Sequence, residues 1–214
     1  FRSHVFDGRN AVIVTLDDGT HVGRGEASGV YYIGDDLEQM LAALANARGA
    51  IEAGPSRAEL RAILPAGGAR NAVDAALWEL ESKRAGRPVW ALAGLDAPRP
   101  LRTTFTVGAD EPARMAAEAV AYRGANAIKV KLTGDLDLDI ARVDAIRAAR
   151  PDVWLGVDAN QGFSIGDLDR LVAAMVAAGV SLIEQPLARG RESDLDGYNA
   201  PIPLAADESA LTLA

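Results

Sequence analysis

Two lysines interrupt an apolar, strand-like segment at residues 127–132. Side chains alternate between the two faces of a strand, so Lys129 and Lys131 share one face and their apolar neighbours share the other. If the apolar face packs under helices, both ammonium groups point into the interior that the strand helps to build. An unpaired buried charge is strongly destabilising. The two lysines are therefore expected to have acidic partners.

Three acidic residues lie toward the carboxyl ends of other strand-like segments: Asp158 at the end of 153–158, Glu184 within 181–185 and Asp207 at the end of 204–207. In parallel α/β folds the active site lies at the carboxyl ends of the strands, and alternation directs these carboxylates to the face of the lysines. Taken singly, Asp158 and Asp207 could be helix N-caps, and Glu184 could form a structural salt bridge. Three acids on successive strands beside paired lysines indicate a functional site.

Three convergent oxygen ligands without His or Cys suit a hard divalent cation, and Mg²⁺ is the expected metal. Two lysines and three carboxylates carry a formal charge of 2 − 3 = −1. One Mg²⁺ makes this +1, so the site is expected to attract a small-molecule carboxylate. Positive charge and desolvation beside Lys131 favour its neutral amine, which predicts a general base. A lysine at the α-carbon of a bound carboxylate is suited to proton abstraction that gives an enediolate.

The composition narrows the functional classes. The 214 residues are 49% hydrophobic, enough for a core, and the net charge is 22 − 30 = −8, which argues against nucleic acid or an anionic membrane as a partner. The absence of cysteine excludes disulfides and thiolate metal sites. No apolar run approaches the roughly 18 residues of a membrane span, and the first residues lack a signal-peptide core. A cytoplasmic location is expected, and a homo-oligomer is left open.

The first hundred residues have the pattern of a small α+β unit. Two β-rich segments, 11–16 and 21–27, flank a turn, and the Gly-Arg-Gly of the second lacks the third glycine of a dinucleotide-binding loop. Helical segments are predicted at residues 36–53, 56–64 and 68–84, followed by an apolar connection at 89–95. The loop at 28–35, with two tyrosines between glycines, is either a surface connection or a mobile lid over a pocket.

Residues 101–214 show a regular alternation of strand-like and helical segments. Strands are predicted at residues 102–107, 127–132, 153–158, 181–185 and 204–207, with helices at 111–123, 138–149 and 165–178. This spacing indicates parallel strands joined by crossover helices, as in a doubly wound sheet or part of a (β/α)8 barrel. No phosphate-binding glycine loop follows the first strand, which favours the barrel.

Four motifs, in this order on successive strands, resemble the enolase superfamily: Lys129-x-Lys131, Val157-Asp158-Ala159-Asn160, Ile183-Glu184-Gln185-Pro186 and Ala206-Asp207-Glu208-Ser209. Within it, the chain is similar to the muconate lactonizing subgroup and its dipeptide epimerases of the Ala-Glu type. The resemblance implies an α+β capping domain over 1–100 with a specificity loop at 28–35, and the N-terminal part of a modified TIM barrel over 101–214. It also implies that Asp158, Glu184 and Asp207 ligate Mg²⁺, that Lys131 is an acid/base and that Lys129 contacts the substrate carboxylate.

One feature departs from the family pattern. The family has a second lysine on the next barrel strand and a later motif for the substrate amino group, and this sequence ends at Ala214 before either. Five strands cannot close an eight-stranded barrel, so we expect the C-terminal part of the barrel to be absent from this sequence. The leading hypothesis is an Mg²⁺-dependent dipeptide epimerase, an isomerase that works by 1,1-proton transfer. The alternatives are N-acylamino acid racemisation, o-succinylbenzoate synthesis, muconate cycloisomerisation, or a non-catalytic truncated member.

Overall fold

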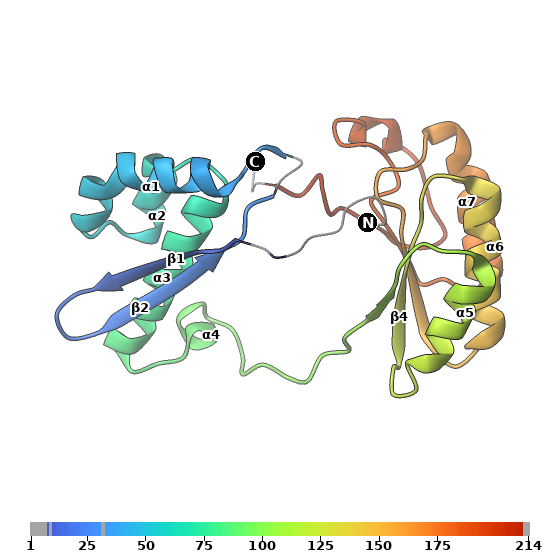
Figure 1. Ribbon diagram of the computed structural model, residues 1–214, viewed down its shortest axis with the longest axis horizontal. Coiled ribbons are helices and arrows are strands. Elements are labelled where there is room, and N and C mark those ends of the chain that lie inside the picture. Colours follow the sequence, from blue (N-terminus) through green and yellow to red (C-terminus); the bar gives the residue numbers. More distant parts are fainter. Residues whose placement is uncertain (1–7, 9, 31–32, 212–214) are drawn as a thin grey trace. The chain divides into compact units, whose positions relative to one another are not determined.

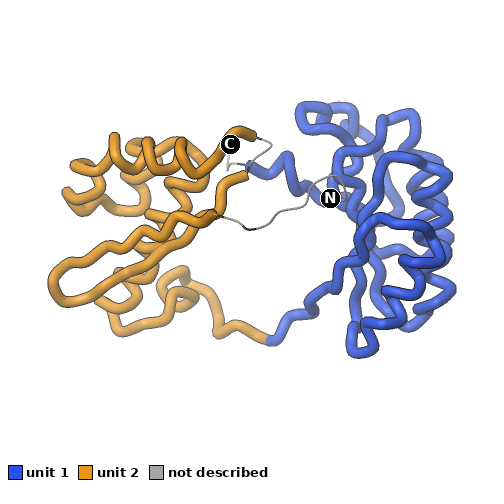
Figure 2. The backbone as a smooth tube through the Cα atoms, viewed as in Figure 1, with its two compact units in different colours: residues 1–5, 100–214 blue, residues 6–99 orange. Residues whose placement is uncertain are grey.

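The computed structural model describes residues 8, 10–30 and 33–211 of the chain. The chain divides into two compact units, and the division falls between Arg99 and Pro100 (Figure 2). The unit before the division contains a two-stranded antiparallel sheet, and the unit after it contains a five-stranded parallel sheet. This matches the predicted order of an α+β unit followed by an α/β unit. Among the described residues, no helix combines the length and the apolar character that crossing a bilayer requires.

The first unit begins with the predicted hairpin. Strands β1 (Val12–Asp17) and β2 (Val22–Ala27) pair antiparallel, with Asp17 opposite Val22. The carboxylate of Asp18 accepts the backbone N–H groups of Thr20 and His21, which holds the turn between the strands. The hairpin prediction is confirmed.

The α-helices of this unit within 33–99 are α1 (Leu37–Glu52), α2 (Arg57–Ile63), α3 (Gly68–Ala85) and the short α4 (Val89–Leu92). Strand β2 packs directly on α3. A Cβ atom at Gly23 would lie 2.1 Å from the carbonyl oxygen of Ala76, and one at Gly25 would lie 1.9 Å from that of Ala72. The two glycines therefore allow the strand to approach the helix. The segment predicted as an apolar connection begins with α4.

The second unit is built on five strands in sequence order: β3 (Phe105–Val107), β4 (Ala127–Lys131), β5 (Trp154–Asp158), β6 (Leu182–Glu184) and β7 (Leu204–Ala205). Each pairs parallel with the next. The crossovers contain α5 (Pro112–Ala121), α6 (Leu136–Ala149), α7 (Ile165–Ala177) and, before β7, the short 3₁₀ helix η2 (Glu192–Leu195).

The three long helices of this unit decide between the two predicted architectures. Figure 1 shows α5, α6 and α7 on the same face of the sheet. A doubly wound sheet has helices on both faces, whereas a (β/α) barrel has all its helices on the outside. The barrel-type prediction is confirmed, with five strands of the barrel among the residues that the structure describes.

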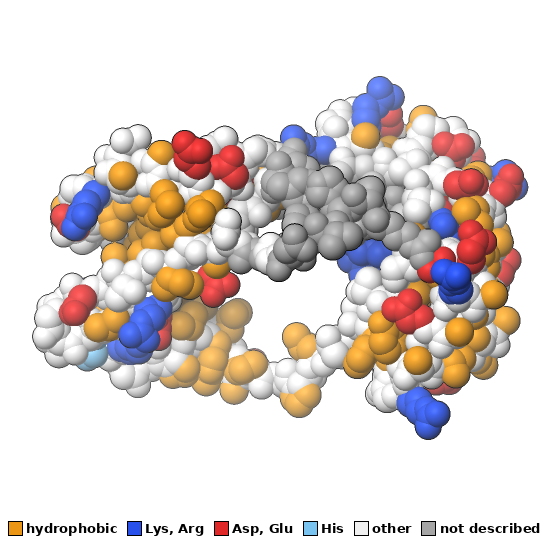
Figure 3. All heavy atoms as spheres, viewed as in Figure 1, with side chains coloured by type: hydrophobic (Ala, Val, Ile, Leu, Met, Phe, Trp, Pro, Cys, Tyr) orange, Lys and Arg blue, Asp and Glu red, His pale blue; other side chains and the backbone are white. Residues whose placement is uncertain are grey.

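The core of the second unit lies between the sheet and these helices. The buried side chains of Ile128 and Val130 belong to the same apolar cluster as Leu155, Ile146 and Met175. Lys129 and Lys131 are only partly exposed and lie on the opposite face of β4. The alternation predicted for this strand is therefore correct, and the apolar face of the sheet leaves the other face for polar chemistry. In Figure 3 the visible acidic and basic side chains are interspersed on each unit.

The strands of this sheet are shorter than predicted, as β3 and β7 illustrate. Strand β3 begins at Phe105, and β7 ends at Ala205, two residues before Asp207. The ladder ends there because the backbone N–H of Asp207 donates to the side-chain Oε1 of Gln185, at 2.9 Å, instead of to a strand carbonyl. Asp207 therefore lies in the turn that follows β7, and its placement depends on a side chain from the neighbouring strand.

Candidate active site

The register of the parallel sheet brings the predicted site residues to one end. Lys131 is the β4 partner of Asp158 on β5, and Asp158 is the partner of Glu184 on β6. All three lie at the carboxyl ends of their strands. Asp207 joins them from the turn after β7, so that Asp158, Glu184 and Asp207 each offer an oxygen within 4.8 Å of the others. The structure brings together all five residues singled out in the sequence.

Lys129 connects two of these acids. Its Nζ lies 2.8 Å from Oδ2 of Asp158 and 2.8 and 2.7 Å from the two oxygens of Glu184. Burial lowers the pKa of the Lys129 ammonium, but the hydrogen bonds to Asp158 and Glu184 outweigh burial, and the pKa is raised from 10.5. Burial likewise raises the pKa of Asp158, but the two ammonium groups lower it below 3.8 overall. Lys129 and Asp158 are therefore both charged at neutral pH.

Lys131 contacts the same oxygen of Asp158 and also borders a cavity. Its Nζ lies 2.5 Å from Asp158 Oδ2. The cavity has a volume of about 510 Å³, and its walls include Asp110, Thr133 and Asn160. A cavity of this size accommodates a small ligand. Lys131 is thus placed between a buried carboxylate and a space that a substrate could enter.

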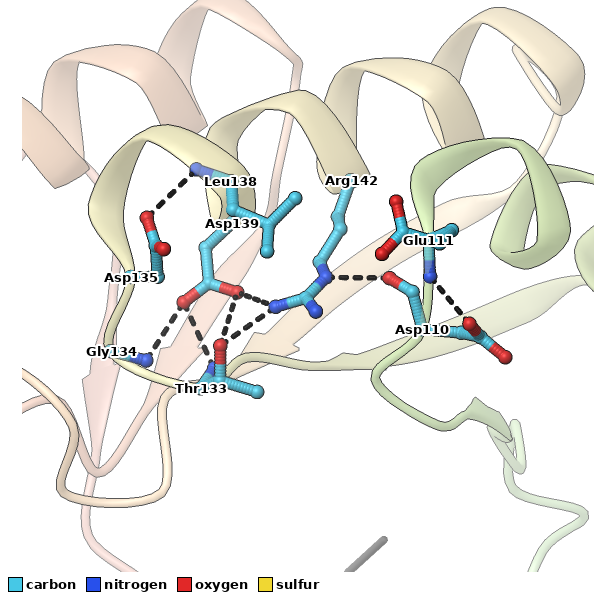
Figure 4. Close-up of polar contacts among 8 residues, drawn as sticks. All are labelled: Asp110, Glu111, Thr133, Gly134, Asp135, Leu138, Asp139 and Arg142. Atoms are coloured by element: carbon cyan, nitrogen blue, oxygen red, sulfur yellow. Dashed lines mark hydrogen bonds and ion pairs between the residues drawn. The ribbon is translucent and has the colours of Figure 1, made fainter.

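Arg142 also lines the cavity, and it forms a buried ion pair with Asp139. Figure 4 shows the contacts of this pair with the loop residues Asp110, Thr133 and Gly134. Asp139 on α6 accepts the backbone N–H groups of Thr133 and Gly134, each at 2.9 Å. Arg142, one turn further along α6, donates to Asp139 and to the Thr133 hydroxyl at 2.7 Å, and its Nε donates to the Asp110 carbonyl at 2.7 Å. The pair ties the loop after β4 to the loop after β3.

Sequence reasoning missed this pair. The available signal was an acidic and a basic residue three positions apart on a helix, directly after the Thr133-Gly134 turn. That spacing is common on exposed helix surfaces, so it gave no reason to expect buried Asp139 and Arg142.

The oxygen atoms of the three clustered acids suit Mg²⁺. The three clustered carboxylates supply only oxygen, which a hard cation prefers. The next residue after Asp207, Glu208, is buried, and its Oε2 has no hydrogen-bond partner among the described residues. A buried carboxylate oxygen without a donor is destabilising unless positive charge lies nearby. The residues present therefore fit a divalent cation.

Comparison with known families agrees with this geometry. Residues 111–214 match the family model described as enolase C-terminal domain-like, and residues 5–94 match that of the mandelate racemase / muconate lactonizing enzyme N-terminal domain. The chain belongs to the enolase superfamily. The two matches lie on either side of the division at Arg99 and Pro100.

Several similar members of the superfamily are named for reactions of dipeptides or N-acylamino acids. The chain is 36% identical to the L-Ala-D/L-Glu epimerase of Escherichia coli K12, over 94% of this chain and 63% of that protein. It is 40% identical to an N-acetyl-D-glutamate racemase of a Pseudoalteromonas species, over 72% of this chain and 48% of that protein. The dipeptide epimerase of Cytophaga hutchinsonii, solved with Mg and D-Ala-L-Val, superposes with a TM-score of 0.83 at 29% identity, over 94% of this chain and 58% of that one.

The chain spans less than two thirds of the length of each of these three relatives. The predicted specificity loop includes residues 31 and 32, which lie outside the described residues. Its role stays a prediction.

Proposed function

We propose that this protein is an Mg²⁺-dependent isomerase that epimerises dipeptides by exchanging the proton α to a carboxylate. The observation that carries the proposal is the position of Lys131, which borders the cavity and contacts Asp158, one of the three clustered acids. The relatives that are named as dipeptide epimerases support the choice of substrate.

The proposed roles follow from position and charge. Asp158, Glu184 and Asp207 hold the metal, which when bound supplies positive charge to the carboxylate of the substrate. Lys129 adds a second positive charge on the same side and attracts that carboxylate. The intermediate has more negative charge on the carboxylate oxygens than the substrate has, so these charges stabilise it more than they stabilise the substrate.

Lys131 carries the proton. Its neutral amine takes the proton from the α-carbon of the substrate, and the electron pair of the C–H bond moves into the carboxylate to give an enediolate. The resulting ammonium can return a proton to the face from which it came. Return to the opposite face requires a second acid. The sequence contains one further lysine, Lys83, which lies on α3 in the other unit and donates to the Val22 carbonyl at 2.6 Å. We propose that the second acid lies outside this sequence.

A second candidate function is racemisation of N-acylamino acids, which the 40% identity to an N-acetyl-D-glutamate racemase favours. Both reactions begin with the same proton abstraction. They differ in the group attached to the amino nitrogen, a peptide residue or an acyl group, and therefore in the walls of the cavity rather than in Lys131 or the acids.

The test is exchange of the α-proton in D₂O. The protein is incubated with Mg²⁺ and a library of dipeptides and N-acylamino acids, and loss of the α-proton signal is followed by NMR. Exchange in one or more dipeptides supports the proposal. Exchange confined to N-acylamino acids would transfer the assignment to the second candidate. No exchange in any compound, with the metal bound, would favour the non-catalytic alternative.

A further inference from the structure

Gln185 is not one of the proposed metal ligands, but it connects two of them, Glu184 and Asp207. Gln185 follows Glu184 directly in the sequence, and only 5% of its surface is exposed. Its backbone has a φ of +39°, in the left-handed region that residues other than glycine adopt when surrounding contacts compensate. A buried polar side chain on a strained backbone, at the end of a strand, indicates that specific contacts hold it there.

Those contacts use the whole amide group. Oε1 accepts the backbone N–H of Asp207 at 2.9 Å and that of Ser209 at 3.1 Å. Nε2 donates to the Leu187 carbonyl at 2.9 Å and to the Ser209 hydroxyl at 2.8 Å. A glutamine amide has two donor hydrogens and two acceptor lone pairs, so its hydrogen-bonding capacity is filled.

The side chain continues the sheet where its backbone ladder stops. The backbone N–H of Gln185 donates to the Ala205 carbonyl at 2.8 Å, which is the last ladder contact between β6 and β7. The next contact toward the active site is made by the side chain, to Asp207. The exposed side chain of Asp207 thus extends from a turn whose backbone is attached to the residue next to Glu184.

We propose that Gln185 is a positioning residue that sets the distance between the carboxylates of Asp207 and Glu184 and thereby the affinity of the site for a divalent cation. The inference rests on the proposed function for the metal site. In this proposal the motif at residues 184–186 supplies the metal ligand Glu184, and through Gln185 it also attaches the end of β6 to the turn after β7. Loss of such a supporting residue in metal sites commonly weakens metal binding by about 10- to 100-fold.

The decisive variant is Gln185→Met, which keeps the length of the side chain and removes all four hydrogen bonds. Its dissociation constant for Mg²⁺, and for Mn²⁺ as a spectroscopic probe, is measured without substrate. We expect about 10- to 100-fold weaker binding. We also expect the rate of α-proton exchange to recover substantially when Mg²⁺ is raised to saturation. A dissociation constant equal to that of the unmodified protein would overturn the inference.

Two further variants separate positioning from general destabilisation. Gln161→Met is the matched control, because Gln161 also has a positive φ, +65°, at this end of the sheet, and its side-chain Oε1 accepts the backbone N–H of Arg189 and makes no contact with Asp207 or Ser209 among the described residues. Its metal affinity is expected to be unchanged. Ser209→Ala removes one partner of Gln185 and is expected to weaken binding to a smaller degree, which keeps the inference testable if Gln185→Met does not fold.

Thermal unfolding provides a second readout. A purely structural role of Gln185 would lower the unfolding midpoint equally with and without Mg²⁺. A positioning role reduces the increase in midpoint that Mg²⁺ produces. If the unmodified protein binds no divalent cation, the proposed metal site itself fails. If it binds and both Gln185→Met and Ser209→Ala bind as tightly, only the positioning role fails.

Discussion

The Nζ of Lys129 lies 2.8 Å from the Oδ2 of Asp158, on the neighbouring strand of the parallel sheet. The same oxygen is contacted by Lys131, so one fully buried carboxylate is shared by two ammonium groups. Asp158 is also one of the three acids that offer oxygens within 4.8 Å of one another. The proposed proton-transfer residue and the proposed metal site therefore meet at one side chain.

Replacement of Lys131 by alanine should remove proton exchange on one face of the substrate. General acid–base catalysis by one side chain typically contributes about 100- to 10,000-fold, so exchange from the corresponding stereoisomer should fall by that factor. The three clustered acids remain, and Mg²⁺ affinity should change little. NMR in D₂O, with each stereoisomer supplied separately, measures the exchange.

Lys83→Ala is the control for that experiment, because Lys83 is the one lysine of the sequence outside β4 and lies on α3, where it donates to the Val22 carbonyl. It should leave exchange unchanged. Undiminished exchange in Lys131→Ala would show that another group takes the proton.

Replacement of Lys129 by methionine should destabilise the metal-free protein. The substitution removes the ammonium group that Asp158 and Glu184 share. A buried charged group that loses its partner lowers the free energy of unfolding by about 1–3 kcal/mol or more. Because Lys129 is still 23% exposed, the lower part of this range is expected. The pKa of Lys129 is raised above 10.5, so its contribution is complete at neutral pH and is lost only as the pH rises through that raised pKa.

Urea unfolding at neutral pH, with a chelator present, measures this loss. Saturating Mg²⁺ should restore much of it, since the metal supplies positive charge to the same acids. A Lys129→Met variant as stable as the unmodified protein without metal would contradict the role assigned to the ammonium group.

The buried pair Asp139–Arg142 on α6 should contribute far more to stability than an exposed pair between α6 and α7. Arg142→Met leaves the buried Asp139 carboxylate without its cation and should cost about 3–5 kcal/mol. The control is Arg170→Ala, which breaks the exposed contact with Asp137 and should cost less than about 1 kcal/mol. Denaturant unfolding gives both values.

A double variant isolates the interaction within this pair. Arg142→Met combined with Asp139→Asn removes both charges, so its cost should be smaller than the sum of the two single losses. Additive losses would mean that the two side chains act independently.

The unfolding free energy should depend on pH through Asp152. Hydrogen bonds from Arg150 lower the pKa of Asp152 from 3.8 to about 2. A lowered pKa in the folded state means that the stabilisation is present above pH 3.8 and is lost as the pH falls toward about 2. Asp152→Asn should therefore be less stable than the unmodified protein above pH 3.8, and the difference should disappear toward about pH 2.

Because the Asp152 side chain is 63% exposed, salt should screen this effect. Unfolding curves at low and high ionic strength, over the same pH range, provide the check. A difference between the two proteins that does not change with pH would contradict the assignment.

Much of the site could be predicted from local pattern. The period-two alternation in 127–132 placed Lys129 and Lys131 on one face, and the chain order of the strands placed Asp158 and Glu184 at one end. These inferences succeed because side-chain direction along a strand depends on backbone geometry alone. The hairpin at 12–27 was recognisable for a similar reason, since its turn is made by residues adjacent in sequence.

Other features depend on contacts between distant segments. Strand β7 stops at Ala205 because the side chain of Gln185, 22 residues before Asp207, takes the next backbone N–H. Arg142 is buried because it reaches the Asp110 carbonyl, 32 residues earlier in the chain. Neither partner can be recognised from the residues around it.

The sequence by itself determined which residue types were available, in what order, and on which face of each strand they would lie, because these follow from composition and backbone periodicity. Only the tertiary structure decided that one oxygen of Asp158 serves both lysines, that Gln185 holds the turn of Asp207, and that Asp139 and Arg142 hold the cavity walls. Those arrangements depend on strand register and on hydrogen bonds between loops, which form only when the whole sheet and its helices have packed together.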